Sequence, residues 1–234
     1  MRNRQRAVPR SAYVLDQAAD GWILPACSAS STVAQTGTTV TVTNGASVAH
    51  NIPATTYDGY NVFFPGSDSI PAGWYAGFAR TGAATYTFTH ATGTVESESV
   101  NAAAAYVTET VVATVTIPGG ALGVDGQLRV HTTWGMNNNA NTKNVNAKLG
   151  AAAVMAFGLA DTASFSDLRY VRNRNDSAKQ VIHPSNQGSV SSGTNAVAYA
   201  AIDTAVDADV TLTMNPATAA DFVVLEGYCV EVLP

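Results

Sequence analysis

Short runs with the character of β-strands, each ended by residues that favour turns, fill the sequence from residue 38 onward. In the run 38–43, for example, Val40 and Val42 alternate with threonines, and Pro118-Gly119-Gly120 closes a similar run over 107–117. Strand side chains alternate between the two faces of a sheet, and β-branched residues favour strands. No segment keeps helical periodicity beyond one short turn each at 102–106 and 217–221. The pattern therefore predicts an all-β fold.

We divide the chain into an N-terminal anchoring arm and connector (1–36), a small β module (37–104) and a C-terminal β-sandwich (105–234). Many short strands without intervening helices are typical of antiparallel sandwiches of the jelly-roll kind. A parallel β-helix is the alternative, although no repeat of fixed period supports it. Strands are predicted at 38–43, 60–64, 74–78, 86–90, 107–117, 127–136, 145–149, 153–159, 165–171, 179–182, 197–202, 210–214 and 222–232.

The small β module has a hairpin signal and nearly half of the chain's aromatic residues. Asn44-Gly45 after an alternating run predicts a hairpin, and a three-residue loop over 44–46 would set Val42 opposite Val48. A module of this size needs aromatic rings to make a core. Nine of the chain's 19 aromatic residues lie in it, namely Tyr57, Tyr60, Phe63, Phe64, Trp74, Tyr75, Phe78, Tyr86 and Phe88.

Charge is scarce and unevenly placed. Charged residues make up 12% of the chain, against about 25% in an ordinary soluble domain. Four of the 12 basic residues, Arg2, Arg4, Arg6 and Arg10, lie in the first ten positions without an acid, so the rest of the chain has a net charge of −9. Such an arm can bind an acidic protein surface or nucleic acid, or remain merely solvated. An acidic body argues against the whole protein being a nucleic-acid binder.

Several other classes are disfavoured. The longest strongly apolar run without charge, 149–160, has twelve residues, whereas a membrane helix needs about 20. No apolar segment follows the arginine-rich start, so we expect synthesis in a cytoplasm without a signal peptide. Cys27 and Cys229 are expected to stay reduced, and the apolar segment Trp22-Ile23-Leu24-Pro25 is expected to dock on another surface.

The search for catalytic or metal-binding chemistry finds little. The four histidines, His50, His90, His131 and His183, are isolated, so no metal site or cofactor is expected, and His131 is predicted to be an ordinary strand-face residue. Glu96 and Glu98 would share a strand face, as a glycosidase pair might, but a solvated pair between modules is the preferred interpretation. The acidic cluster Asp203, Asp207 and Asp209 is interpreted as turn chemistry rather than as a cation site. We expect a protein that is not an enzyme.

Two segments are candidates for binding a ligand or receptor. Trp74 and Tyr75 are adjacent, so on a strand they face opposite ways, and a ring that leaves the core can stack on a sugar. Core packing is nonetheless the commoner fate of such rings in a chain with few aromatic residues. The run that contains Asn137, Asn138, Asn139 and Asn141 predicts a loop tip whose amides suit glycan hydroxyls, although turn geometry alone also explains it. Arg169, Arg172 and Arg174 lie near Asp167 and Asp176 and are expected to form ion pairs or subunit contacts.

About half of the chain resembles a β-sandwich module of tailed-phage virion proteins, found at the ends of tail fibres and head fibres. The similar stretches are IPGGALGVDGQLRV (117–130), HTTWGMNNNANTKNVNAKLG (131–150), RYVRNRND with SAKQV (169–181) and AIDTAVDADVTLTMNPATAADFVVLEGYCVEVL (201–233). The segment HNIPATTYDGYNVFFPGSDSIPAGWYAGF (50–78) resembles, more weakly, segments that precede such modules.

The resemblance implies a homotrimer in a virion, with loops that contact a host glycan, a receptor or a neighbouring virion protein. We therefore expect a short tail fibre or receptor-binding fibre, anchored through Arg2, Arg4, Arg6, Arg10, Trp22, Ile23 and Leu24. A head fibre or capsid decoration protein is the nearest alternative, and a free carbohydrate-binding module and a glycan depolymerase are further ones. The low charge is compatible with a trimer, because interface cores are depleted in charge.

Overall fold

Sixteen strands and no helix make up the described part of the chain, which confirms the all-β expectation. The computed structural model describes residues 13–18, 21–25, 30–45, 49–101, 109–182, 197–216, 218 and 220–233. The Arg-rich segment 1–10, Cys27, Val48, the expected turn at 102–106 and His183 lie outside these residues. At the other expected short turn, residues 218, 220 and 221 are not helical.

The C-terminal part is a sandwich of two antiparallel layers. One layer contains β14 (Ala198–Ala200), β13 (Gln180–Ile182), β12 (Ser164–Asn173), β9 (Gln127–Met136) and β16 (Phe222–Leu233), in that order. The other contains β11 (Ala152–Leu159), β10 (Lys143–Leu149), β15 (Ala208–Asn215) and β8 (Thr110–Ile117). The chain crosses between the layers at β8–β9, β9–β10, β11–β12, β14–β15 and β15–β16, which gives the sandwich predicted from its many short strands.

Buried and less buried residues alternate along the strands, and the buried ones form the core between these layers. On β10, residues 143, 145, 147 and 149 are buried and the residues between them are half-buried. Trp134 on β9 and Leu212 on β15 are fully buried within the same core. Because side chains of a strand point to opposite faces in turn, this alternation is what makes the predicted strands pack as layers.

The small module has its own core, which the aromatic residues dominate as predicted. Its sheet consists of β3 (Thr32–Thr43), β7 (Thr85–Ser99) and β6 (Ala79–Arg80), and it packs with β4 (Asn61–Phe64) and β5 (Gly73–Tyr75). Phe64, Phe78, Tyr86 and Phe88 are fully buried there. The strand expected at 86–90 continues to Ser99, so the expected link between modules is part of a strand.

The hairpin expected at Asn44-Gly45 is not the pairing that β3 makes. Val42 lies opposite Tyr86, because the antiparallel partner of β3 is β7. The backbone N–H of Asn44 donates to the carbonyl of Ala84 at 2.8 Å, so Asn44 closes the end of this β3–β7 ladder. An Asn-Gly turn indicates where the chain reverses, but it does not specify the strand against which the preceding strand packs.

Two strands from the expected connector lie in the large sheet. β2 (Trp22–Pro25) pairs antiparallel with β16 and parallel with β4, and β1 (Tyr13–Ala18) pairs with the second half of β16. Hydrogen bonding therefore continues through β5, β4, β2 and β16 into the sandwich, across the boundary placed near residue 105.

The structure corrects the attachment role expected for Ile23 and Leu24. Ile23 is fully buried in the core of the small module, and Leu24 is fully buried in the core of the sandwich. The predicted docking of this segment is confirmed, but its surface is within the same chain. These two side chains are therefore not exposed for contact with another protein, while the half-buried Trp22 packs with its ring centre 5.8 Å from that of Tyr228.

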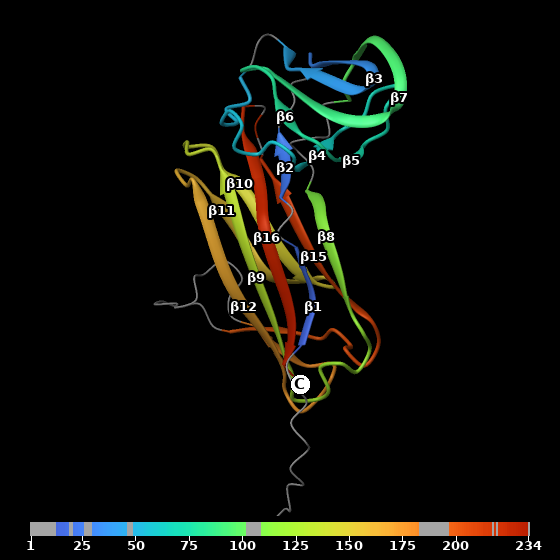
Figure 1. The fold of residues 1–234 in the computed structure, drawn as a ribbon. Coiled ribbons are helices and arrows are strands. Elements are labelled where there is room, and N and C mark those ends of the chain that lie inside the picture. Colours follow the sequence, from blue (N-terminus) through green and yellow to red (C-terminus); the bar gives the residue numbers. More distant parts are fainter. Residues whose placement is uncertain are drawn as a thin grey trace, which may run out of the picture.

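The body is elongated, with the two cores stacked end to end (Figure 1). The small module lies at one end, and the C-terminus lies at the other. Tyr13, the first described residue, pairs with Val232, so β1 begins beside the C-terminal end of β16. The segment that carries the N-terminal arginines is thus joined to the chain at the end opposite the small module.

Replacing Ile23 or Leu24 by alanine should lower the free energy of unfolding by about 2–5 kcal/mol, because each change leaves a cavity in a different core. Val206→Ala is the control, since Val206 is 60% exposed and such surface changes stay within about 0.5 kcal/mol. Denaturant unfolding followed by tryptophan fluorescence measures all three variants. Stabilities of I23A and L24A equal to that of V206A would contradict the two-core role of β2.

Candidate functional site

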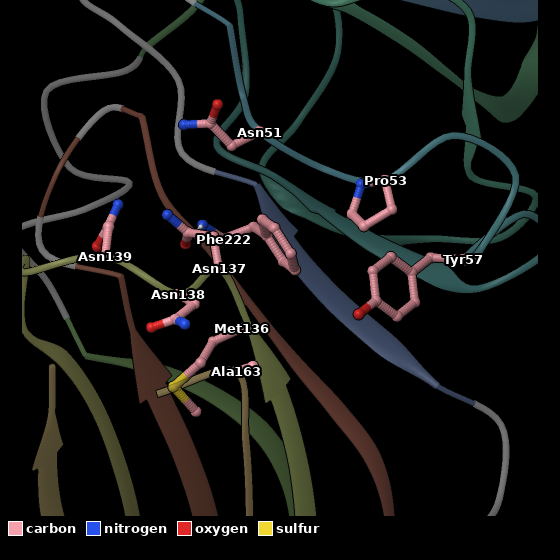
Figure 2. A pocket seen from close by; sticks show the side chains of 9 residues that line it. All are labelled: Asn51, Pro53, Tyr57, Met136, Asn137, Asn138, Asn139, Ala163 and Phe222. Carbon is pink, nitrogen blue, oxygen red and sulfur yellow. Dashed lines mark hydrogen bonds between the residues drawn. The ribbon is translucent and has the colours of Figure 1, made fainter. Parts of the chain in front are cut away.

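A pocket of about 580 Å³ lies where the small module meets the sandwich (Figure 2). Asn51, Pro53 and Tyr57 line it from the small module. The sandwich contributes Met136, Asn137, Asn138, Asn139, Ala163 and Phe222. None of these lining side chains is charged, and the volume falls in the range of about 300–1,000 Å³ that is usual for small-molecule sites.

The ends of two long strands position the sandwich side of this pocket. β9 ends at Met136, and the three asparagines follow directly, while Phe222 begins the neighbouring strand β16. The rings of Phe222 and Tyr57 lie 5.7 Å apart at 60° and join the two sides. Asn51 has a φ of 53°, which asparagine tolerates better than most residues, and its Nδ2 donates to the carbonyl of Ala220 at 2.8 Å.

The fully buried carboxylate of Asp221 organises the asparagine loop. The Nδ2 groups of Asn137 and Asn139 each donate to Asp221 Oδ1 at 2.6 Å. Asn141 Nδ2 donates to the same oxygen at 3.4 Å, and the Thr218 hydroxyl donates to Oδ2. Burial raises the pKa of Asp221, but these hydrogen bonds outweigh it, so that the pKa lies below its ordinary value of 3.8.

A fully buried lysine completes this network. Lys143 Nζ donates to the side-chain oxygen of Asn139 at 2.8 Å and to its backbone carbonyl at 3.2 Å. Asn137 Oδ1 accepts the backbone N–H of Phe222 at 3.0 Å. The amides of Asn137 and Asn139 therefore have a defined orientation, because each uses its oxygen and its nitrogen on different partners.

The structure places the predicted asparagines together but gives them different roles. Asn137, Asn139 and Asn141 direct their amides to Asp221, which agrees with the structural interpretation of this loop, and their role in ligand binding stays a prediction. Asn138 is exposed at the pocket, and its side chain makes no hydrogen bond to the described residues. Asn138 is thus the member of the run that remains able to bind a ligand.

Trp74 and Tyr75 point to opposite sides of β5, as their adjacency predicts, but both are used in packing. Trp74 packs edge-on against Phe63, and its indole N–H donates to the carbonyl of Val111 at 3.1 Å. Tyr75 stacks on Phe88 at 4.7 Å, and its hydroxyl donates to the carbonyl of Pro71 at 2.7 Å. Neither ring lines the pocket. These contacts agree with core packing, the commoner fate expected for them, and sugar stacking stays a prediction.

The acidic candidates serve structural roles. Glu98 is held by the backbone N–H and the hydroxyl of Ser69, which lower the pKa of its carboxyl, whereas Glu96 is exposed. Asp203 accepts the N–H of Ala205 at 2.9 Å, which confirms the interpretation as turn chemistry. Asp207 and Asp209 instead make long-range bonds. Asp207 accepts the backbone N–H of Gly119 at 2.8 Å, and Asp209 accepts the hydroxyl of Thr116, its partner on β8, at 2.7 Å. Within the described ranges, no group of three or more His, Cys, Asp or Glu residues could hold a metal.

The remaining predicted residues are accounted for by single contacts. His131 is an exposed strand-face residue, as expected, and lies 3.1 Å from the Ser166 hydroxyl. Arg169 forms the expected ion pair with Asp167, and this pair is buried. Arg172 donates to Gln127 at 2.9 Å, and the guanidinium of Arg174 lies 5.1 Å from the centre of the Tyr199 ring. Cys229 is a free, half-buried thiol whose pKa is raised by burial.

A second polar cluster lies behind Tyr57. The hydroxyl of Tyr60 donates to Glu226 Oε2 at 2.8 Å, and burial together with this carboxylate raises the pKa of Tyr60 to about 12. A Cβ at Gly135 would lie 2.8 Å from Glu226 Oε1 and 3.2 Å from the Tyr57 hydroxyl. Glycine at 135 therefore leaves the space in which these two polar groups approach β9.

Comparison with protein-family models and with curated proteins found no match to this chain. Across the ranges that the structure describes, no helix has the length and apolar character needed to cross a membrane.

Replacing Asp221 by asparagine should destabilise the protein at neutral pH by about 1–3 kcal/mol, because a buried acceptor of several hydrogen bonds loses its charge. A depressed carboxyl pKa stabilises the fold above the unfolded-state pKa, and this contribution is lost as the pH falls through the folded-state pKa. The difference between wild type and D221N should therefore narrow as the pH falls below 3.8.

Unfolding by urea at a series of pH values measures this effect. Asp68→Asn, at an exposed carboxylate, is the control, and its stability should follow that of the wild type throughout. A difference between wild type and D221N that stays constant from pH 7 to acid would contradict a stabilising Asp221 carboxylate.

Proposed function

We propose that this chain is a non-enzymatic subunit of a tailed-phage virion fibre that binds a host-surface glycan in the pocket beside the small module. The pocket is the observation that carries the binding role. Its wall combines the exposed amide of Asn138 with the buried rings of Tyr57 and Phe222 beneath it, and it contains no charged side chain. Amides suit the hydroxyls of a sugar, and an uncharged wall favours a neutral ligand.

The positions of the N-terminal arm and the small module at opposite ends of the body support a fibre. The N-terminal arm joins the chain beside the C-terminus, at the end opposite the small module. An arm at one end can hold the subunit to a tail or capsid protein, while the other end faces outward. The four arginines of the arm suit an acidic protein surface, since guanidinium groups bind carboxylates in pairs of hydrogen bonds.

The pocket lining also supports a role without catalysis. Hydrolysis of a glycosidic bond by the common mechanisms requires two carboxyl groups on either side of the bond. None of the residues that line the pocket is Asp or Glu. The nearby carboxylates are engaged, because Asp221 is held by the asparagines and Glu226 accepts from Tyr60.

The outer face of the large sheet is the proposed trimer interface. One cross-strand row runs Val14, Glu231, Arg129 and Tyr170, with an ion pair between Arg129 and Glu231. Val14 is 45% exposed and Tyr170 is 43% exposed at the two ends of this row, and Tyr199 on β14 is 64% exposed. A face that mixes exposed large apolar side chains with paired charges is suited to contact a second copy.

The same architecture also fits a head fibre or a capsid decoration protein, in which the arm binds the shell instead of the tail. The pocket by itself fits a third role, that of a free carbohydrate-binding module.

Two variants test glycan binding. Ala163→Trp should block the pocket and abolish binding, because Ala163 is exposed at its wall. Asn138→Ala should weaken binding about fivefold, the effect of one lost hydrogen bond. The measurement is competition by purified protein against phage adsorption, together with binding to arrays of host-surface glycans.

Asn101→Ala is the matched control, since Asn101 is an exposed asparagine away from the pocket. Each variant should keep the unfolding transition of the wild type. Wild-type competition and glycan binding by both A163W and N138A would remove the pocket from the proposal.

Light scattering on the purified full chain tests the trimer. We expect three copies per particle, and Tyr170→Arg should dissociate them, because it places a second cation beside Arg129 on the apolar face. Thr114→Arg, at an exposed position on the opposite layer, is the control. A wild-type chain that is monomeric at micromolar concentration would contradict the fibre proposal and favour the free binding module.

A further inference from the structure

The buried amine of Lys143 has no opposite charge beside it. Its side chain is fully buried at the start of β10, and no described Asp or Glu lies within 4.0 Å of its Nζ. Its hydrogen-bond partners are both oxygens of one residue, Asn139. A buried, unpaired ammonium is costly, because burial removes its hydration without supplying a counter-charge.

The side chain of Asn139 lies between this amine and a buried carboxylate. Lys143 Nζ is 2.8 Å from Asn139 Oδ1, and Asn139 Nδ2 donates to Asp221 Oδ1 at 2.6 Å. The Asn139 amide is thus hydrogen-bonded to the amine through its oxygen and to the carboxylate through its nitrogen, which places both groups next to the amide whose Cγ would be attacked. Both flanking groups are fully buried, so water does not compete with the amine at this position.

We propose that Lys143 and Asn139 join in an intramolecular isopeptide bond, with Asp221 as the group that moves the proton. The free amine of Lys143 attacks Cγ of Asn139 and forms the new C–N bond. The new bond brings Nζ next to Nδ2, where Asp221 is hydrogen-bonded, so the carboxylate can carry a proton from Nζ to Nδ2. The Cγ–Nδ2 bond then breaks, and ammonia departs. Amide plus amine gives substituted amide plus ammonia, so the step needs no oxidant or cofactor.

The surroundings suit this step and its product. Asn139 also lines the open pocket, which gives ammonia a route to solvent. The product is a neutral amide in place of a buried cation, and Asp221 keeps donors from Asn137, Asn141 and Thr218. The bond closes the turn that presents Asn138. This inference does not depend on the ligand of the pocket, because the bond forms within one chain.

Intact mass and a tryptic digest of the wild-type full chain test the proposal. The intact mass should be lower than the sequence mass by one ammonia. Trypsin does not cut after an acylated lysine, so residues 130–148 should appear as one peptide lacking one ammonia. A full sequence mass, with cleavage after Lys143 into 130–143 and 144–148, would overturn the proposal.

The digest also separates this bond from the other reaction that releases ammonia. Succinimide formation at Asn44-Gly45 gives the same mass loss but leaves cleavage after Lys143 intact, and that result would also overturn the proposal.

Variants of Lys143, Asn139 and Asp221 test the part that each residue plays in forming the bond. Lys143→Met and Asn139→Ala should each restore the mass expected from the variant's own sequence. Asp221→Asn should slow the loss of ammonia, followed by mass from the time of refolding, by at least tenfold. Asn141→Ala, a neighbour that contacts Asp221 but not Lys143, should keep the bond. Bond formation in D221N at the wild-type rate would remove Asp221 from the reaction.

Discussion

The pairing of β2 with β16 is the contact on which the rest of the structure depends, because it holds two cores together with strands from opposite ends of the chain. At the start of β16, Phe222 and Val224 enter the core of the small module, while Val223 and Leu225 enter the core of the sandwich. Ile23 and Leu24 divide in the same way on β2. Neighbouring residues thus serve different cores, since a strand buried on both faces has no solvent side. A shift of one residue in this register would exchange the two sets.

The candidate site depends on the same strands. The pocket lies where β9 ends and β16 begins, so its floor is fixed by the alignment of two central strands rather than by the loops alone. Asp221, the residue before β16, then ties the loop after β9 to that position through Asn137 and Asn139. The side chains of Asp221, Asn137 and Asn139 satisfy one another's hydrogen bonds, and such mutual satisfaction is the condition under which a buried polar group orders a structure. These contacts therefore fix the position of the loop that forms one wall of the pocket.

Local patterns predicted the strands well and the site only in part. The run 127–136 matches β9 because its alternation is a property of consecutive residues. The asparagine run indicates a loop, because this signal too lies in consecutive residues. Its main partner, Asp221, lies more than 80 residues away, and no spacing in the sequence connects the two. Ile23 and Leu24 likewise look like an exposed apolar anchor until β16 and β4 are seen to cover them. Pairing over long sequence distances is set by packing, which a one-dimensional pattern does not contain.

We propose that this elongated body is held to a phage tail by its N-terminal end and binds the host through the junction of its two cores. The position of the chain in an assembled particle tests this most directly. Electron microscopy of virions that carry a gold label on the C-terminus of this chain would locate its attachment end, because β1 begins beside that terminus. The account predicts labels confined to the tail. Labels spread over the icosahedral shell, or virions that carry no label, would contradict it.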